Sequence, residues 1–194
     1  MQLCSTFLSF LLLLLASQSP RDTIRKYYEA AEAQRIAGNT AAAEANFIAL
    51  LGEAHLRLAN AYSAQKDFKE AATALEAAAQ CRPDSDDVLI DLAIAHFNAG
   101  QFEKAFNPLG KVLGRNPQSA GARQMMGKAY FMLGAFQKSA SELEAALKLK
   151  PNDFDVAYTL GLAHLKQRQL APAKQIYDQL IKAIGDRPQL RIVL

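Results

Sequence analysis

The feature that most constrains the fold of this chain is an internal repeat of 34 residues. Residues 86–119 align with residues 120–153 without a gap. Equivalent positions carry the same residue at Ala95 and Ala129, Gly100 and Gly134, Phe102 and Phe136, Leu109 and Leu143, Leu113 and Leu147, and Pro117 and Pro151. A fixed period of roughly 20–50 residues indicates a stacked repeat array, in which each unit packs against its neighbours. The same frame extends to residues 52–85 and 154–187, so we expect four consecutive units.

Each unit has the pattern of two antiparallel helices. Apolar residues recur with helical spacing, as in Leu89, Leu92, Ala93 and His96 of the second unit. The first helix is expected over positions 2–14 of a unit and the second over positions 16–30. Pro83, Pro117 and Pro151 separate the units, because proline cannot continue a helix. The chain is therefore predicted to be all-α.

The region before the first regular unit departs from the frame. A helix is expected over residues 23–37, and Gly38 and Asn39 end it. In the 34-residue frame, about six residues of the next inter-unit turn are missing before Gly52. Since residues 40–65 favour helix and contain no proline, we expect one long helix there, with Gly52 as a point of bending. We assign residues 22–51 as an atypical or capping helical pair.

One proline falls inside a predicted helix. Pro108 lies in the second helix of residues 86–119, where it removes a backbone hydrogen bond and should bend the helix. Both a tolerated kink and a functional hinge fit this position.

The two ends of the chain carry further expectations. Residues 1–19 contain no charged side chain, and the apolar run Phe7–Ala16 has the length of a signal-peptide core. We predict a signal peptide and an exported protein, periplasmic or secreted; an uncleaved membrane anchor and a wrongly assigned start are the alternatives. Residues 188–194 fit the start of a truncated fifth repeat.

Composition and motifs exclude several function classes. The net charge of +3 is too small to predict binding to nucleic acid. Cys81 is alone in the body of the chain and lies at a predicted helix end, where it serves as a small packing residue. The histidines His55, His96 and His164 stand at packing positions of their units, so no metal site is expected. No nucleotide-binding, hydrolase or metal-binding motif occurs, and we expect neither a cofactor nor enzymatic activity.

The units resemble tetratricopeptide repeats, whose core pattern is Leu-Gly-x-x-Tyr, then Ala-x-x-x-Phe, then Pro. The third unit has Met126-Gly127-x-x-Tyr130, then Ser139-x-x-x-Leu143, then Pro151. The fourth has Leu160-Gly161-x-x-His164, then Ala173-x-x-x-Tyr177, with Gly185 in place of proline. The first two follow the same order, beginning at Leu58 and Leu92. The resemblance covers nearly all of residues 22–194 and implies a right-handed superhelical solenoid of antiparallel helix pairs.

Small residues explain why the pattern takes this form. Positions 8 and 20 of the units hold Ala59, Ala93, Gly127, Gly161, Ala71, Ala105, Ser139 and Ala173. Small side chains there let paired helices approach to about 8–10 Å. We expect these positions to be buried.

The resemblance also implies a binding surface on the concave side, lined by the first helices. The candidate binding residues are Asn60, Ile90, Ile94, Phe97, Asn98, Gln124, Lys128, Phe131, Tyr158, Leu162 and Leu165. The same side includes Asp87 and Asp91. The chaperone-binding subfamily holds a terminal carboxylate with a clamp of lysine, asparagine and arginine side chains. The equivalent residues here are Leu56, Asn60, Asp91, Gly121 and Met125; only Asn60 matches, and Asp91 would repel a carboxylate.

Two interpretations of the apolar candidates remain open. Some of them pack on a neighbouring first helix, or they line a surface that takes an apolar peptide or helix. We predict a non-enzymatic scaffold that binds a protein or peptide partner, with membrane contact only through an uncleaved N-terminal segment. The alternatives are the repeat region of a larger enzyme or secretion-machine subunit and a purely architectural spacer.

Overall fold

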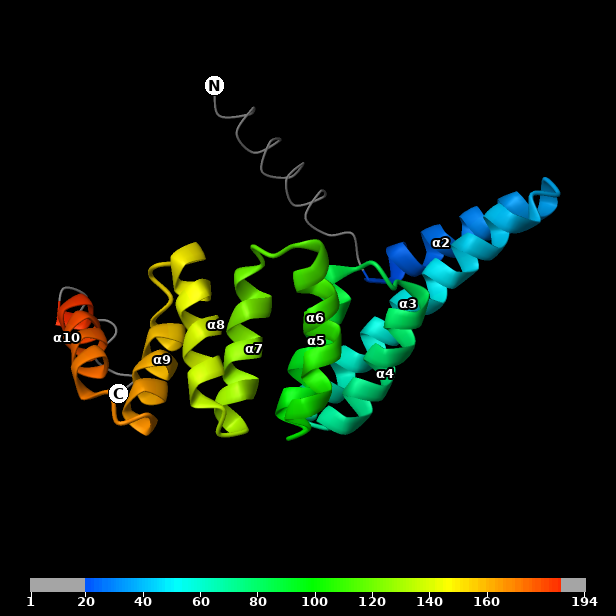
Figure 1. Cartoon of the computed structure of the whole chain (residues 1–194). Coiled ribbons are helices and arrows are strands. Elements are labelled where there is room, and N and C mark those ends of the chain that lie inside the picture. Colours follow the sequence, from blue (N-terminus) through cyan, green and yellow to red (C-terminus); the bar gives the residue numbers. More distant parts are fainter. Residues whose placement is uncertain (1–19, 186–194) are drawn as a thin grey trace, which may run out of the picture.

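The structure, a computed structural model, describes residues 20–185, and all regular secondary structure in that range is helical. The α-helices are α2 (Pro20–Ile36), α3 (Thr40–Ala64), α4 (Phe68–Cys81), α5 (Asp86–Asn98), α6 (Phe106–Arg115), α7 (Ala120–Met132), α8 (Phe136–Leu149), α9 (Phe154–Lys166) and α10 (Leu170–Gly185). A 3₁₀ helix, η1 (Phe102–Ala105), precedes α6. From α4 onwards the helices stand side by side in chain order (Figure 1). The predicted all-α solenoid of helix pairs is confirmed.

The predicted signal segment, residues 1–19, and the predicted start of a fifth repeat, residues 188–194, lie outside the described residues. Among the helices of residues 20–185, none combines the length and the hydropathy that a bilayer crossing requires.

The helix boundaries follow from capping and turn residues. Ser85, Ser119 and Asp153 precede α5, α7 and α9, and their side chains accept a hydrogen bond from a backbone N–H in the first turn. This is the arrangement of an N-cap residue. Within each unit the two helices meet at a residue with positive φ, such as Gly100 (φ 74°) and Gly134 (φ 75°), where glycine avoids steric strain.

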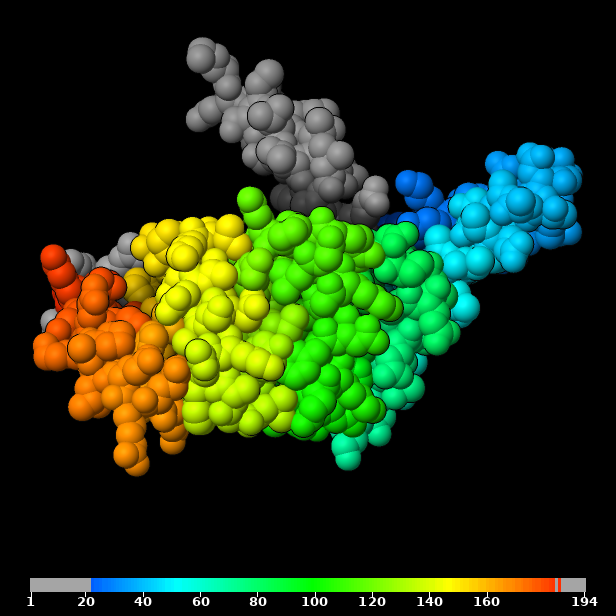
Figure 2. Space-filling view, in the orientation of Figure 1, coloured from blue at the N-terminus to red at the C-terminus, as the bar shows by residue number. Residues whose placement is uncertain are grey.

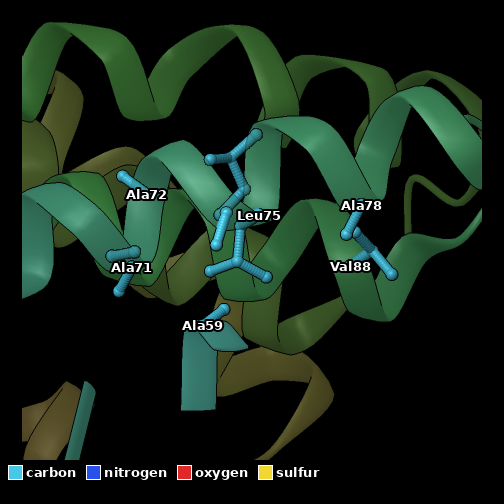
Figure 3. Packing of buried hydrophobic residues seen from close by; sticks show 9 residues of the cluster. Ala59, Ala71, Ala72, Leu75, Ala78 and Val88 are labelled. Carbon is cyan, nitrogen blue, oxygen red and sulfur yellow. The ribbon is translucent and has the colours of Figure 1, made fainter. Parts of the chain in front are cut away.

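Close helix pairing rests on the small residues at positions 8 and 20. Ala59, Ala93 and Ala105 are at most 1 % exposed, and Gly127 and Gly161 are buried. A Cβ atom added at Gly127 would lie 2.6 Å from Leu143 Cγ, which leaves no room for a side chain. Figure 3 shows Ala59 and Ala71 beside Leu75 in the buried apolar cluster that joins α3, α4 and α5. The predicted burial of these positions is confirmed.

The helix predicted over residues 40–65 is present as the single helix α3. Together with α2, its first half forms a hairpin that projects away from the row of paired helices (Figures 1 and 2). The helix remains continuous through Gly52, which is buried; a Cβ atom there would lie 3.0 Å from Cys81 Cβ at the end of α4. The helix predicted over residues 23–37 begins earlier, at Pro20, because proline suits the first position of a helix.

Pro108 changes the type of its helix. It is the third residue of α6, within the first turn. Backbone N–H groups in the first turn have no acceptor within the helix, so a proline there costs α6 no hydrogen bond. The turn before it is the 3₁₀ helix η1, in which Lys104 N donates to Gln101 O. The expected disruption is thus confined to a 3₁₀ turn at the start of the second helix.

Candidate interaction surface

The candidate binding residues all lie on the first helices of the units. We call their solvent-facing side the first-helix face: the second half of α3 together with α5, α7 and α9. None of the eleven candidates is buried: five are exposed and six are half-buried. The exposed ones are Asn60, Ile94, Asn98, Tyr158 and Leu165, and the half-buried ones are Ile90, Phe97, Gln124, Lys128, Phe131 and Leu162.

A polar contact between α7 and α9 shows how adjacent first helices align. Gln124 Nε2 donates to Asp155 Oδ2 at 3.2 Å, and Lys128 Nζ forms an ion pair with the same carboxylate. Position 2 of one first helix therefore lies beside positions 5 and 9 of the preceding one. The repeat pattern places Asp155 on this side of the array, but its pairing with Gln124 and Lys128 was not predicted, because it depends on which side chains the stacking brings beside it.

The apolar candidates divide between core and surface. Ile90 packs against the cluster that joins α5, α6 and α7, and Phe131 against the one that joins α8 and α9. Phe97 and Phe131 also contact Phe102 and Phe136, with ring centroids 5.2 and 5.5 Å apart. The packing interpretation therefore applies to Ile90, Phe97 and Phe131, although the two aromatic contacts are with the second half of the same unit rather than with a neighbouring first helix.

Three apolar candidates remain open to solvent. The exposed fractions of Ile94, Tyr158 and Leu165 are 36 %, 45 % and 41 %. The ring of Tyr158 stands edge-on to that of Tyr177, with centroids 6.0 Å apart. Burial, and secondarily Tyr158, raise the pKa of Tyr177, so the phenol of Tyr177 stays neutral at physiological pH. These three are the exposed apolar side chains among the candidates.

The charges on the first-helix face are unevenly compensated. Glu53 on α3 forms ion pairs with Arg57 (2.9 Å) and Arg82 (3.3 Å). By contrast, Asp87 and Asp91 on α5 are exposed, and no cationic side chain within residues 20–185 forms an ion pair with either. Burial, and secondarily the charge of Asp87, raise the pKa of Asp91.

The histidines link neighbouring units. His96 Nδ1 lies 3.0 Å from Gln101 Oε1, and its Nε2 lies 3.5 Å from Glu76 of the preceding unit. His164 repeats this arrangement with Gln169 at 2.7 Å and Glu144 at 3.7 Å. Both rings are buried, so the predicted packing role is confirmed for them, whereas His55 is half-buried. In the described part of the chain no three His, Cys, Asp or Glu side chains converge to hold a metal ion.

Comparison with known proteins agrees with this architecture. The crystal structure of MamA protein superimposes with a TM-score of 0.66 at 18% identity, over 89% of this chain and 98% of that one. MamA from Desulfovibrio magneticus RS-1 gives a TM-score of 0.68 at 16% identity, over 86% and 97%. YrrB, described as a TPR protein with an unusual peptide-binding site, gives 0.65 at 18% identity, over 88% and 94%. No curated protein matches the sequence significantly.

Sequence models of the repeat family match three stretches of the chain. They are described as "Tetratricopeptide repeat" over residues 62–107, "TPR repeat" over residues 127–167 and "Tetratricopeptide repeat" over residues 155–183. Together these stretches cover more than half of the sequence, and they fall within the helices α3 to α10. The chain belongs to the tetratricopeptide-repeat family.

Proposed function

We propose that this protein is a non-enzymatic scaffold that binds a protein or peptide partner on its first-helix face. The observation that carries the proposal is the set of exposed apolar side chains there, Ile94, Tyr158 and Leu165, on helices already fixed by the array. Burying apolar surface stabilises a complex by about 25 cal/mol per Å², with little dependence on salt. The peptide-binding site described for YrrB supports the same kind of function for this fold.

The rigid array favours binding because the face is already formed before a partner arrives. Phe97, Phe131 and Ile90 hold the first helices through their own packing, so a partner need not order them. An amphipathic helix can then use anchors spaced like those of the face itself.

The test is to capture partners from the exported fraction of the native cells with the intact chain and to measure the affinity of the purified partner. Tyr158→Ala and Ile94→Ala should each weaken binding by about tenfold or more, as apolar anchors at interface centres do. Leu149→Ala is the matched control, since Leu149 is 37 % exposed but lies on the second helix α8. Lys128→Ala and Lys166→Ala, at low and high salt, test the role of charge.

The proposal fails if the lysine substitutions and added salt abolish binding while both apolar substitutions leave it intact. An equal loss with Leu149→Ala would move the binding surface to the second helices.

We also propose that the protein is exported, on the basis of residues 1–19 alone. Fractionation of cells that make the tagged full-length chain tests this. Recovery from the cytosol with an intact N-terminus contradicts it.

A further inference from the structure

We infer that the partner segment is basic as well as apolar: an amphipathic peptide whose lysine or arginine side chain lies against Asp87 and Asp91 of α5 while its apolar side covers Ile94. This inference rests on the proposed function, because it names the chemistry of the partner for the same face.

The two carboxylates lie one helical turn apart on the exposed side of α5, so they act as a local pair. Residues four apart on a helix are neighbours, and like charges at that spacing repel. Ile90 lies three residues after Asp87, and Ile94 lies three residues after Asp91, so the apolar residues are neighbours of the two carboxylates on the same helix. A single side chain from a partner can therefore meet both the acidic pair and the apolar residues beside it.

Other acidic residues of this region already have partners in the chain. Asp84 and Asp86, next to Asp87 in sequence, form ion pairs with Arg115 at 3.1 and 2.6 Å. Asp155 occupies the same repeat position as Asp87 and is paired with Lys128. At the positions equivalent to Gln124 and Lys128, the unit before Asp87 has Leu56 and Asn60, neither of which carries a positive charge. Among the acidic residues on the second half of α3 and on α5, α7 and α9, only Asp87 and Asp91 have no ion pair within residues 20–185.

The energetics point to a cation supplied from outside. Partial burial, and secondarily the charge of Asp87, raise the pKa of Asp91, so the ionised form of Asp91 is disfavoured. A lysine or arginine head group offsets the repulsion between the two carboxylates and favours the charged form of Asp91, and its aliphatic stem can lie along Ile94. The same charges disfavour acidic peptides and nucleic acid.

The probes for the test are three synthetic helical peptides of about 18 residues, a length at which an isolated helix is stable enough to compare. They share one apolar face and differ at two polar positions one turn apart, which carry lysine, glutamine or glutamate. Affinities for the full chain are measured by fluorescence anisotropy at about 50 mM and about 500 mM salt, where screening differs strongly.

The lysine peptide should bind about three- to tenfold more tightly than the glutamine peptide at low salt, and the glutamate peptide should bind least, as expected for partly exposed ion pairs. The double substitution Asp87→Asn, Asp91→Asn should remove the ranking without weakening the glutamine peptide. The matched control is Glu70→Gln with Glu103→Gln, which removes two exposed charges from α4 and η1.

The outcomes separate the two proposals. If all three peptides bind equally and lose affinity in Ile94→Ala, the face binds peptides and the preference for basic partners is wrong. If no peptide binds, the proposed function fails and this inference fails with it. If sedimentation shows that the protein alone associates and that the double substitution separates it, the acidic pair contacts a second copy of the chain, and the peptide proposal is overturned.

Discussion

The N-terminal hairpin and the regular units have the same contact between the two helices of a pair. In the hairpin, Ala31 of α2 and Ala43 of α3 are 0 % and 4 % exposed. Their equivalents in the second unit, Ala93 and Ala105, are both fully buried. The turn is also shared, because Gly38 has a φ of 77° like Gly100 and Gly134. The hairpin is therefore built as a repeat internally.

The two regions differ in the contact between one pair and the next. Leu113 and Leu147 pack against clusters that contain residues of the following unit. Leu51 has the same repeat position but is 51 % exposed, at the edge of a shallow apolar hollow of about 400 Å³ on α3. The missing inter-unit turn explains this, because the next first helix continues from Leu51 along the same axis and cannot fold back over it.

The comparison shows that pairing within a unit and stacking between units are separable. A helix pair forms wherever small residues face each other across a tight turn. Stacking also needs a turn between units and a residue that caps the next first helix. Ser85, Ser119 and Asp153 cap α5, α7 and α9, whereas α3 runs on as one helix without a turn or a cap before its second half.

The largest expected effect comes from breaking the contact within a regular pair. Gly127→Leu should lower the free energy of unfolding by about 3 kcal/mol, the upper range for overpacked cores. The reason is the 2.6 Å approach to Leu143 Cγ and the 3.3 Å approach to its backbone nitrogen. Urea denaturation followed by circular dichroism measures the change. Gly121→Ala is the control, since a Cβ atom there meets nothing within 4 Å. An unchanged midpoint for Gly127→Leu would refute the pairing.

The stacking contact should distinguish the two regions directly. Leu147→Ala should lower the free energy of unfolding by about 1–2 kcal/mol, because its half-buried side chain packs on the buried cluster that joins α8 and α9. Leu51→Ala at the equivalent position should change stability by no more than about 0.5 kcal/mol, as for most exposed sites. Equal losses in the two variants would mean that something covers Leu51 in solution.

A smaller effect of opposite sign is expected at Ser139. Its hydroxyl is fully buried and has no hydrogen-bond partner among the described residues, whereas the equivalent residues Ala43, Ala71, Ala105 and Ala173 are alanines. Ser139→Ala should raise the free energy of unfolding by about 1 kcal/mol, the lower range for an unsatisfied buried polar group. Thermal denaturation of the two proteins tests this, and a loss of stability would show that the hydroxyl has a partner.

The smallest effect concerns Asp91 on a regular first helix. Its pKa is raised in the folded state, so ionisation at neutral pH lowers stability, and protonation as the pH falls through that raised pKa removes the penalty. Asp91→Asn should therefore slightly raise the denaturation midpoint at pH 7, and the difference should vanish below about pH 3.9, the ordinary value for aspartate. Glu103→Gln is the control. A difference that persists unchanged at low pH would contradict the assignment to this charge.

Much of the fold was predictable because it depends on local patterns that recur. The 34-residue period, the small residues at positions 8 and 20 and the separating prolines predict helix pairs, and α4 to α10 follow them to within a few residues. Even the long helix α3 was predictable, since the sequence contains no break between residues 40 and 65. The 3₁₀ turn before Pro108 was not predictable. An α-helical turn and a 3₁₀ turn differ only in whether the hydrogen bond spans four residues or three, and the surrounding packing decides between them.

The candidate surface was predictable only as a set of positions. The family resemblance named the residues of the first-helix face, and all of them are accessible to some degree. Which of them support the array, as Phe131 does, and which remain open, as Ile94 does, depends on the distance between neighbouring helices.

The sequence by itself determined the helix pairs and their order, because each pair is specified by residues close together in the chain. Only the tertiary structure decided that Lys128 compensates Asp155 while Asp87 and Asp91 stay without a cation, and that Leu51 lies bare where Leu147 is covered. These differences arise between units, where contacts join residues about one repeat apart. A repeat pattern makes such positions look equivalent, but the side chains that meet there are not the same.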